Sequence, residues 1–106
     1  MKPSRDIRQR REETKTLMYG AKTFYVAKDM ERAWMYTEMA LAFSPNNVEA
    51  LTNKGALLAN GGDLTGALAL FEEAMKIDHG YRRAHAHFFN TLKVSVREWA
   101  RLGNFA

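Results

Sequence analysis

The sequence repeats its pattern of residue types with a period of 34 residues. Between residues 14–47 and 48–81, a shift by 34 positions brings five residues onto identical ones, namely Leu17, Asp29, Ala33, Glu38 and Ala40 onto Leu51, Asp63, Ala67, Glu72 and Ala74. Other positions agree in size, such as Ala21 with Gly55. A period of about 20 to 50 residues indicates a repeat architecture, in which each unit buries its apolar face only against its neighbours. The chain is therefore expected to fold as a short stack of similar units.

Each unit is predicted to be helical. Turn-forming residues at 44–47 and 60–63 interrupt the apolar pattern, and between them apolar and polar residues do not alternate as they would in a strand. Within one segment Leu64, Leu68 and Phe71 recur at helical spacing. The sequence predicts five α-helices, near residues 5–28, 31–43, 48–60, 64–77 and 81–102. Helices joined by such short connections pack as antiparallel neighbours, so the expected fold is all-α.

Length and composition fit one globular domain. The chain has 106 residues, of which 46% are hydrophobic and 26% charged, and it has no cysteine. Disulfides and thiolate metal sites are thereby excluded. No apolar run reaches the roughly 18 residues that a membrane span needs, and no apolar stretch of a secretory signal follows the first residues. We therefore expect a cytoplasmic protein without a membrane span.

The residue types that carry catalysis or hold metals are few and poorly spaced. His85 and His87 are two positions apart, which places them about 200° apart around a helix, and His79 is expected in a turn. Glu72 and Glu73 are adjacent and point to different sides of their helix. These patterns favour ordinary turn and surface residues over a metal site or a carboxylate pair for acid–base catalysis. We predict no enzymatic activity, no catalytic residue, no metal and no cofactor.

The net charge of +4 is unevenly distributed. Residues 48–81 hold two basic and five acidic residues, a net charge of −3, whereas residues 82–106 hold five basic and one acidic residue, a net charge of +4. The N-terminal run contains the cations Arg5, Arg8, Arg10 and Arg11. Acidic residues interrupt this run, and no aromatic residue alternates with it for stacking on bases. Residues 1–13 are therefore interpreted as a solvated, basic extension of the first helix, with nucleic acid or an anionic surface as a less favoured partner.

The second copy of the repeat resembles the tetratricopeptide repeat family. The residues that carry the resemblance are Leu51, Gly55 and Leu58 in its first helix, Gly62 and Asp63 in the turn, and Ala67, Phe71 and Ala74 in its second helix. In the first copy Ala21 takes the place of the glycine, and Thr37 stands where an aromatic residue is usual. The resemblance implies repeats at residues 14–47 and 48–81, followed by a capping helix and short tail at residues 82–106. It also implies an α-solenoid of antiparallel helix pairs that forms a right-handed superhelix.

Members of this family are in general scaffolds that bind peptides or protein partners in a concave groove lined by the first helix of each pair. By that resemblance the groove residues are Lys15, Met18, Lys22, Tyr25, Asn53, Asn60, Arg83, His87 and Asn90. This groove is basic, so the implied partner is a protein segment with acidic groups, because hydrogen bonds between charged groups and carboxylates are the stronger ones. Lys22, Asn53 and Arg83 would fix its polar groups, and Tyr25 would supply apolar contact.

One subfamily clamps the C-terminal carboxylates of heat-shock chaperones with five groove positions. These positions fall here on Met18, Lys22, Asn53, Arg83 and His87, and only Asn53 is identical to the subfamily pattern. The departure at Met18, where the pattern has lysine, removes one of the expected cations. The resemblance therefore favours an adaptor that binds another protein segment over this particular clamp.

Self-assembly is the alternative function. Two repeats and a cap form a short array, whereas folds of this kind generally need about three repeats for stability. The fifth helix carries Phe88 and Trp99, which form an apolar patch if the rest of the protein does not cover them. In that case the protein is a structural module that forms a homo-oligomer through this helix.

Overall fold

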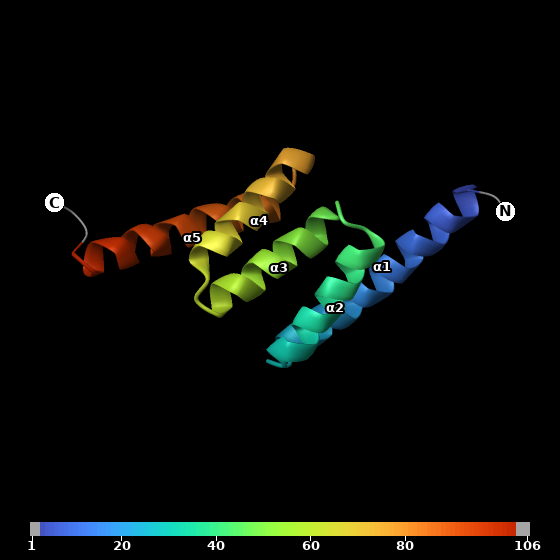
Figure 1. Cartoon of the computed structure of the whole chain (residues 1–106), viewed down its shortest axis with the longest axis horizontal. Coiled ribbons are helices and arrows are strands. Elements are labelled where there is room, and N and C mark those ends of the chain that lie inside the picture. The colour runs from blue at the N-terminus through green and yellow to red at the C-terminus, as the bar shows by residue number, and fades with distance from the viewer. Residues whose placement is uncertain (1–2, 104–106) are drawn as a thin grey trace.

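The computed structural model describes residues 3–103, with side chains described from residue 7 onward, and this part of the chain folds into helices joined by short turns (Figure 1). The helices are α1 (Pro3–Val26), α2 (Met30–Phe43), α3 (Val48–Asn60), α4 (Leu64–Ile77) and α5 (Arg82–Arg101). The described residues contain no strand. The all-α prediction is confirmed, and the predicted limits of the third and fourth helices match those observed.

The first helix ends earlier than the sequence predicted. It was expected to continue to residue 28, but it stops at Val26, because Lys28 adopts the left-handed conformation with φ 67°. The N-termini of α2, α3 and α4 are each capped by a side chain. Asp29, Asn47 and Asp63 each accept a hydrogen bond from the backbone N–H three residues later, at 3.1, 2.9 and 2.9 Å. Such a cap satisfies one of the N–H groups that a helix N-terminus leaves unpaired.

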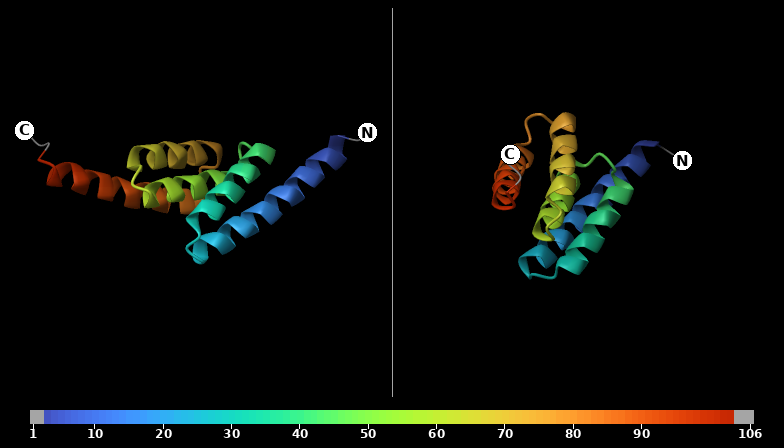
Figure 2. Two further views of the ribbon diagram at one scale, coloured as in Figure 1. Left: turned by 60° about the horizontal axis from the view of Figure 1, so that its bottom comes forward. Right: turned by 60° about the vertical axis from the view of Figure 1, so that its left-hand side comes forward.

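The helices form two hairpins and one additional helix. In Figure 2, α1 lies along α2, while α3 and α4 lie side by side, and α5 packs on α4. The two hairpins meet where α2 contacts α3, and α5 also reaches α3. The radius of gyration is 15.6 Å, compared with about 13 Å for a compact domain of this length. The molecule is therefore elongated, and the views in Figures 1 and 2 show α1 and α5 projecting at its two ends.

Small residues form most of the core. Ala33, Ala40, Ala50, Ala67, Ala74 and Ala84 are each 0 or 1% exposed. They allow the helices to approach closely, which buries backbone and side chain together. Phe71 is the largest fully buried side chain, and it packs over Gly55, where an added Cβ would lie only 2.5 Å from the ring. The 34-residue period thus reflects where helices cross, as the sequence pattern predicted.

Candidate functional site

A pocket of about 420 Å³ lies between α1, α3 and α5. Its lining residues are Lys22, Tyr25 and Val26 from α1, Asn53 and Ala56 from α3, and Arg83 and His87 from α5. These three helices are the first members of successive 34-residue units, so the same face of each is turned toward the pocket. The period explains this directly, since Asn53 and His87 are equivalent positions, as are Lys22 and Ala56.

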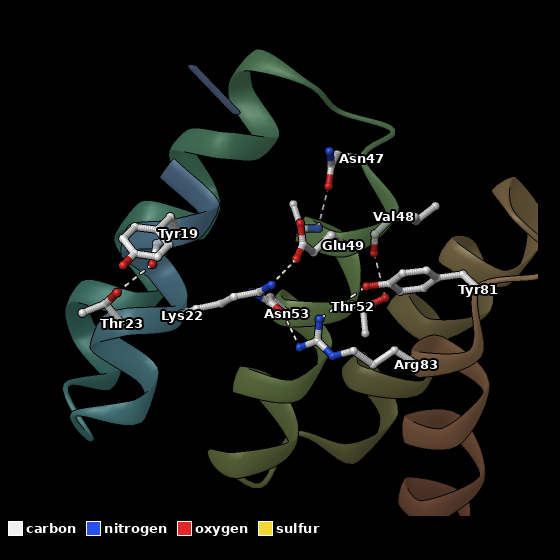
Figure 3. A network of polar contacts seen from close by, with 11 residues as sticks. Tyr19, Lys22, Thr23, Asn47, Val48, Glu49, Thr52, Asn53, Tyr81 and Arg83 are labelled. Atoms are coloured by element: carbon white, nitrogen blue, oxygen red, sulfur yellow. Dashed lines mark hydrogen bonds and ion pairs between the residues drawn. The ribbon is translucent and has the colours of Figure 1, made fainter. Parts of the chain in front are cut away.

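Arg83 is held at the wall of the pocket by two hydrogen bonds. Its Nη2 donates to Oδ1 of Asn53 at 2.7 Å, and its Nη1 donates to the Tyr81 hydroxyl at 3.3 Å (Figure 3). Asn53 is 9% exposed, so it is a fixed anchor. A guanidinium has more N–H groups than these two bonds use. The remaining donors can therefore bind a carboxylate while the group stays in place.

Lys22 is engaged by an acidic neighbour. Its Nζ lies 2.6 Å from Oε2 of Glu49, and the two side chains are 53% and 34% exposed. Figure 3 shows the lysine reaching from α1 across to α3, beside Asn53. Exposed ion pairs of this kind contribute only about 0–1 kcal/mol. A bound carboxylate could therefore share or replace Glu49 at little cost.

The surroundings of His87 favour its uncharged form. Its ring stacks on Phe71, with ring centroids 5.4 Å apart and an interplanar angle of 21°. Burial lowers the pKa of His87 below its ordinary value of 6.5, and the nearby Arg83 cation lowers it further. The imidazole consequently offers the pocket one hydrogen-bond donor and one acceptor rather than a positive charge.

Tyr25 is positioned by a residue from the next unit. The amide Nδ2 of Asn60 donates to the Tyr25 hydroxyl at 2.7 Å, which links the C-terminal ends of α1 and α3. Asn60 is exposed and does not line the pocket, so it positions Tyr25 rather than forming the wall. Val26 lines the pocket but was not among the predicted groove residues. It lies 34 residues before Asn60, which was predicted, so the repeat period could have identified it.

The remaining predicted groove residues do not join this pocket. Met18 is 3% exposed and packs in the core with Ala40 and Ala50, so its side chain forms a floor and does not project into the groove. Lys15 and Met18 line a second concavity nearer the N-terminus, and Asn90 is exposed outside both. The predicted groove is therefore divided in two.

The two residues predicted for self-association differ in exposure. Phe88 is half-buried and packs edge-on against Phe89, with ring centroids 5.4 Å apart. Trp99 lies near the C-terminal end of α5 and is 45% exposed.

The described residues contain no cluster of three or more histidine, cysteine, aspartate or glutamate side chains placed to hold a metal ion. Within the same part of the chain, none of the helices combines the length and the apolar character that crossing a membrane requires.

The fold and the pocket define a class of protein: an all-helical stack of antiparallel helix pairs with a concave pocket, lined by both apolar and charged side chains, on the face formed by α1, α3 and α5. The chain is similar to the DnaJ homolog subfamily C member 7 homolog of Schizosaccharomyces pombe, with 32% identity over 74 residues. The match covers 70% of this chain but only 16% of that protein. No family model matches the chain. The helix pairs and this relative are compatible with the tetratricopeptide resemblance.

Proposed function

We propose that this protein is a non-catalytic protein-interaction module that binds an acidic segment of a partner protein in the pocket between α1, α3 and α5. The observation that carries the proposal is the hydrogen bond from Arg83 to Asn53, which fixes a guanidinium at the pocket wall with N–H groups to spare. The similarity to a DnaJ homologue supports a co-chaperone-like role.

The pocket is matched to a short segment in size and polarity. Its volume of about 420 Å³ is in the range of small ligand sites and suits one or two side chains of a longer segment. Arg83 and Lys22 lie on opposite walls, so they can bind two oxygens of one acidic group or two neighbouring groups. Tyr25, Val26 and Ala56 supply the apolar surface between them. Mixed apolar and charged walls of this kind favour a peptide over a small ion.

The test is the affinity for a short fluorescent peptide whose last two residues are glutamate, measured by fluorescence anisotropy. We expect Arg83→Glu to weaken binding by about tenfold or more, because it removes a charge-assisted bond and adds repulsion. Arg82→Glu is the matched control, since the adjacent Arg82 is exposed and does not line the pocket. Equal weakening in both variants would show that only the net charge matters, and would contradict the proposal.

Lys22 needs a different control because of its ion pair. Lys22→Glu alone places two carboxylates together, whereas Lys22→Glu combined with Glu49→Lys restores the pair in reverse. Circular dichroism and thermal melting establish that each variant is folded. The reversed pair should retain the stability of the wild type and still bind the peptide, because a cation remains beside Asn53.

Self-association is a second candidate function. An apolar stripe on α5 and the residue that follows it, defined here as Leu92, Val96, Trp99 and Leu102, is 38%, 54%, 45% and 66% exposed. Exposed apolar residues on one helix face mark protein contacts more often than isolated ones do. The occupant that this candidate requires is a second copy of the chain.

A further inference from the structure

We infer that the binding groove continues onto the N-terminal part of α1, where Arg10, Arg11 and Lys15 form a second subsite for acidic groups. The bound segment would then carry two acidic clusters, one in each subsite. This inference rests on the proposed function, because the second subsite is argued as an extension of the first.

The second concavity has a volume of about 570 Å³. Arg10, Arg11 and Lys15 line it from α1, and Phe43 and Asn47 line it from the end of α2 and the turn that follows. All three cations are exposed, and none of them forms an ion pair with another described residue. Glu49 is the acidic residue of the lining, and its carboxylate is already paired with Lys22. The positive charge of this hollow is therefore largely uncompensated.

Helical spacing explains why the cations gather there. Arg11, Lys15 and Lys22 are separated by four and seven residues, which places them along one face of α1, above the buried Met18. The adjacent acidic residues Glu12 and Glu13 do not line this concavity. Arg10 also lines a smaller hollow that contains Glu13, whereas Arg11 and Lys15 do not. We therefore take Arg11 and Lys15 as the main cations of the second subsite.

The two pockets meet at the Lys22–Glu49 ion pair. Lys22 lines the first pocket and Glu49 the second, and their side chains are in contact. A segment lying along α1 would pass over this pair. Arg11 and Lys22 are eleven positions apart, which corresponds to about 16 Å along a helix axis. An extended chain covers that distance with about five residues, so the two acidic clusters should be about five residues apart.

The lining favours a protein segment over nucleic acid. A nucleic-acid strand carries a phosphate at every nucleotide, so some phosphates would face the Glu49 carboxylate midway along the groove. A peptide can place uncharged residues at that point and acidic residues at each end. Phe43, 38% exposed at the rim, also provides apolar contact for the side chains in between.

The experiment compares two labelled peptides on the full chain. One ends in two glutamates, and the other carries an additional pair of glutamates about five residues before them. The variant combines Arg11→Gln with Lys15→Gln. The matched control combines Lys93→Gln with Arg97→Gln, which removes the same charge from α5 at residues lining neither pocket. We expect the double variant to bind the two-cluster peptide about five- to tenfold more weakly than the wild type does. The double variant should change the affinity for the one-cluster peptide by less than about twofold. The control variant should change the affinity for either peptide by less than about twofold.

Three other results would overturn the inference. If the wild type binds both peptides equally well, the second subsite is wrong while the first still stands. If it binds neither, the proposed function fails as well. If a single-stranded oligonucleotide of equal charge displaces the two-cluster peptide more effectively than unlabelled peptide does, the hollow is a general polyanion site. Binding of the two-cluster peptide to the wild type should weaken with added salt, because the cations are exposed.

Discussion

At the residue scale, Gly55 and Phe71 are matched in size. Phe71 is fully buried, and an added Cβ on Gly55 would lie 2.5 Å from its Cε1 atom. One period earlier the same two positions are held by Ala21 and Thr37, a slightly larger residue paired with a smaller one. In the first unit Thr37 therefore stands in place of the aromatic residue, and both positions remain buried, since Ala21 is 1% and Thr37 0% exposed.

This match makes Gly55→Ala a destabilising change. We expect a loss of about 1–3 kcal/mol in the free energy of unfolding, because the buried ring cannot move aside, and this exceeds the gain of up to about 1 kcal/mol from alanine in a helix. Gly20→Ala is the control. Its Cβ would lie 2.6 Å from Cδ2 of Tyr36, but that ring is half-buried and can rotate away. Urea unfolding compares the two, and equal stability of both variants would contradict the explanation.

His87 should make stability depend on pH. Burial, with the Arg83 cation, lowers its pKa in the folded protein below the unfolded value of 6.5. Between these two values the unfolded state binds more protons, so stability rises with pH. The contribution is complete above about pH 6.5 and is lost as the pH falls toward the lowered pKa.

The measurement is urea unfolding at about pH 7.5 and pH 5.5. His87→Gln should show a smaller difference between the two conditions than the wild type. His79→Gln, in the turn after α4, is the control and should keep the difference of the wild type. If His87→Gln keeps it as well, another group is responsible for the pH dependence.

At the element scale, α5 is covered unevenly. Its N-terminal half packs on α4 and α3, and Ala84 and Thr91 are buried there. Its C-terminal half projects past the other helices (Figure 2) and exposes Leu92, Val96, Trp99 and Leu102. The N-cap residue of the helix, Tyr81, makes no side-chain capping hydrogen bond. The N-terminal half of α5 thus covers α4 and α3, and the other half presents the apolar stripe.

The stripe predicts weak self-association. We expect the apparent mass in light scattering to rise from 12.1 kDa toward twice that value over a roughly hundredfold range of concentration. Val96→Glu should abolish the rise because it places a charge inside the contact. Val94→Glu, 41% exposed on another side of the same helix, is the matched control and should not. A constant mass at every concentration would mean that this face binds no second copy.

At the scale of the whole molecule, the elongated shape creates the groove. The structure measures 62 × 30 × 18 Å, and its two hairpins are joined by the contact between α2 and α3. This leaves α1 and α3 far enough apart at their surface to form a pocket, bridged by Lys22–Glu49 and by Tyr25–Asn60. Both bridges consist of exposed polar side chains and are individually weak. The width of the groove is therefore set mainly by helix packing beneath it.

The sequence by itself determined the helices and their order. Capping side chains at Asp29, Asn47 and Asp63 fix where helices begin, and these are local signals. The 34-residue period fixes which face of each helix is buried, because equivalent positions meet equivalent neighbours. Lys22, Asn53 and Arg83 could be assigned to one surface for that reason, although their binding role stays a prediction.

Only the tertiary structure decided how that surface is divided. Arg83 pairs with Asn53 across 30 residues, Lys22 pairs with Glu49, and the buried Met18 forms part of the floor of the second hollow. A repeat period gives the face of each helix, but the tilt between the hairpins depends on side-chain packing where α2 meets α3. The period also does not predict the surfaces at the two ends of the array, because no neighbouring unit covers them. For this reason the folded molecule decided the shape of the basic hollow on α1 and the extent of the apolar stripe on α5, although the sequence had already predicted cations on the first helix and Trp99 on the fifth.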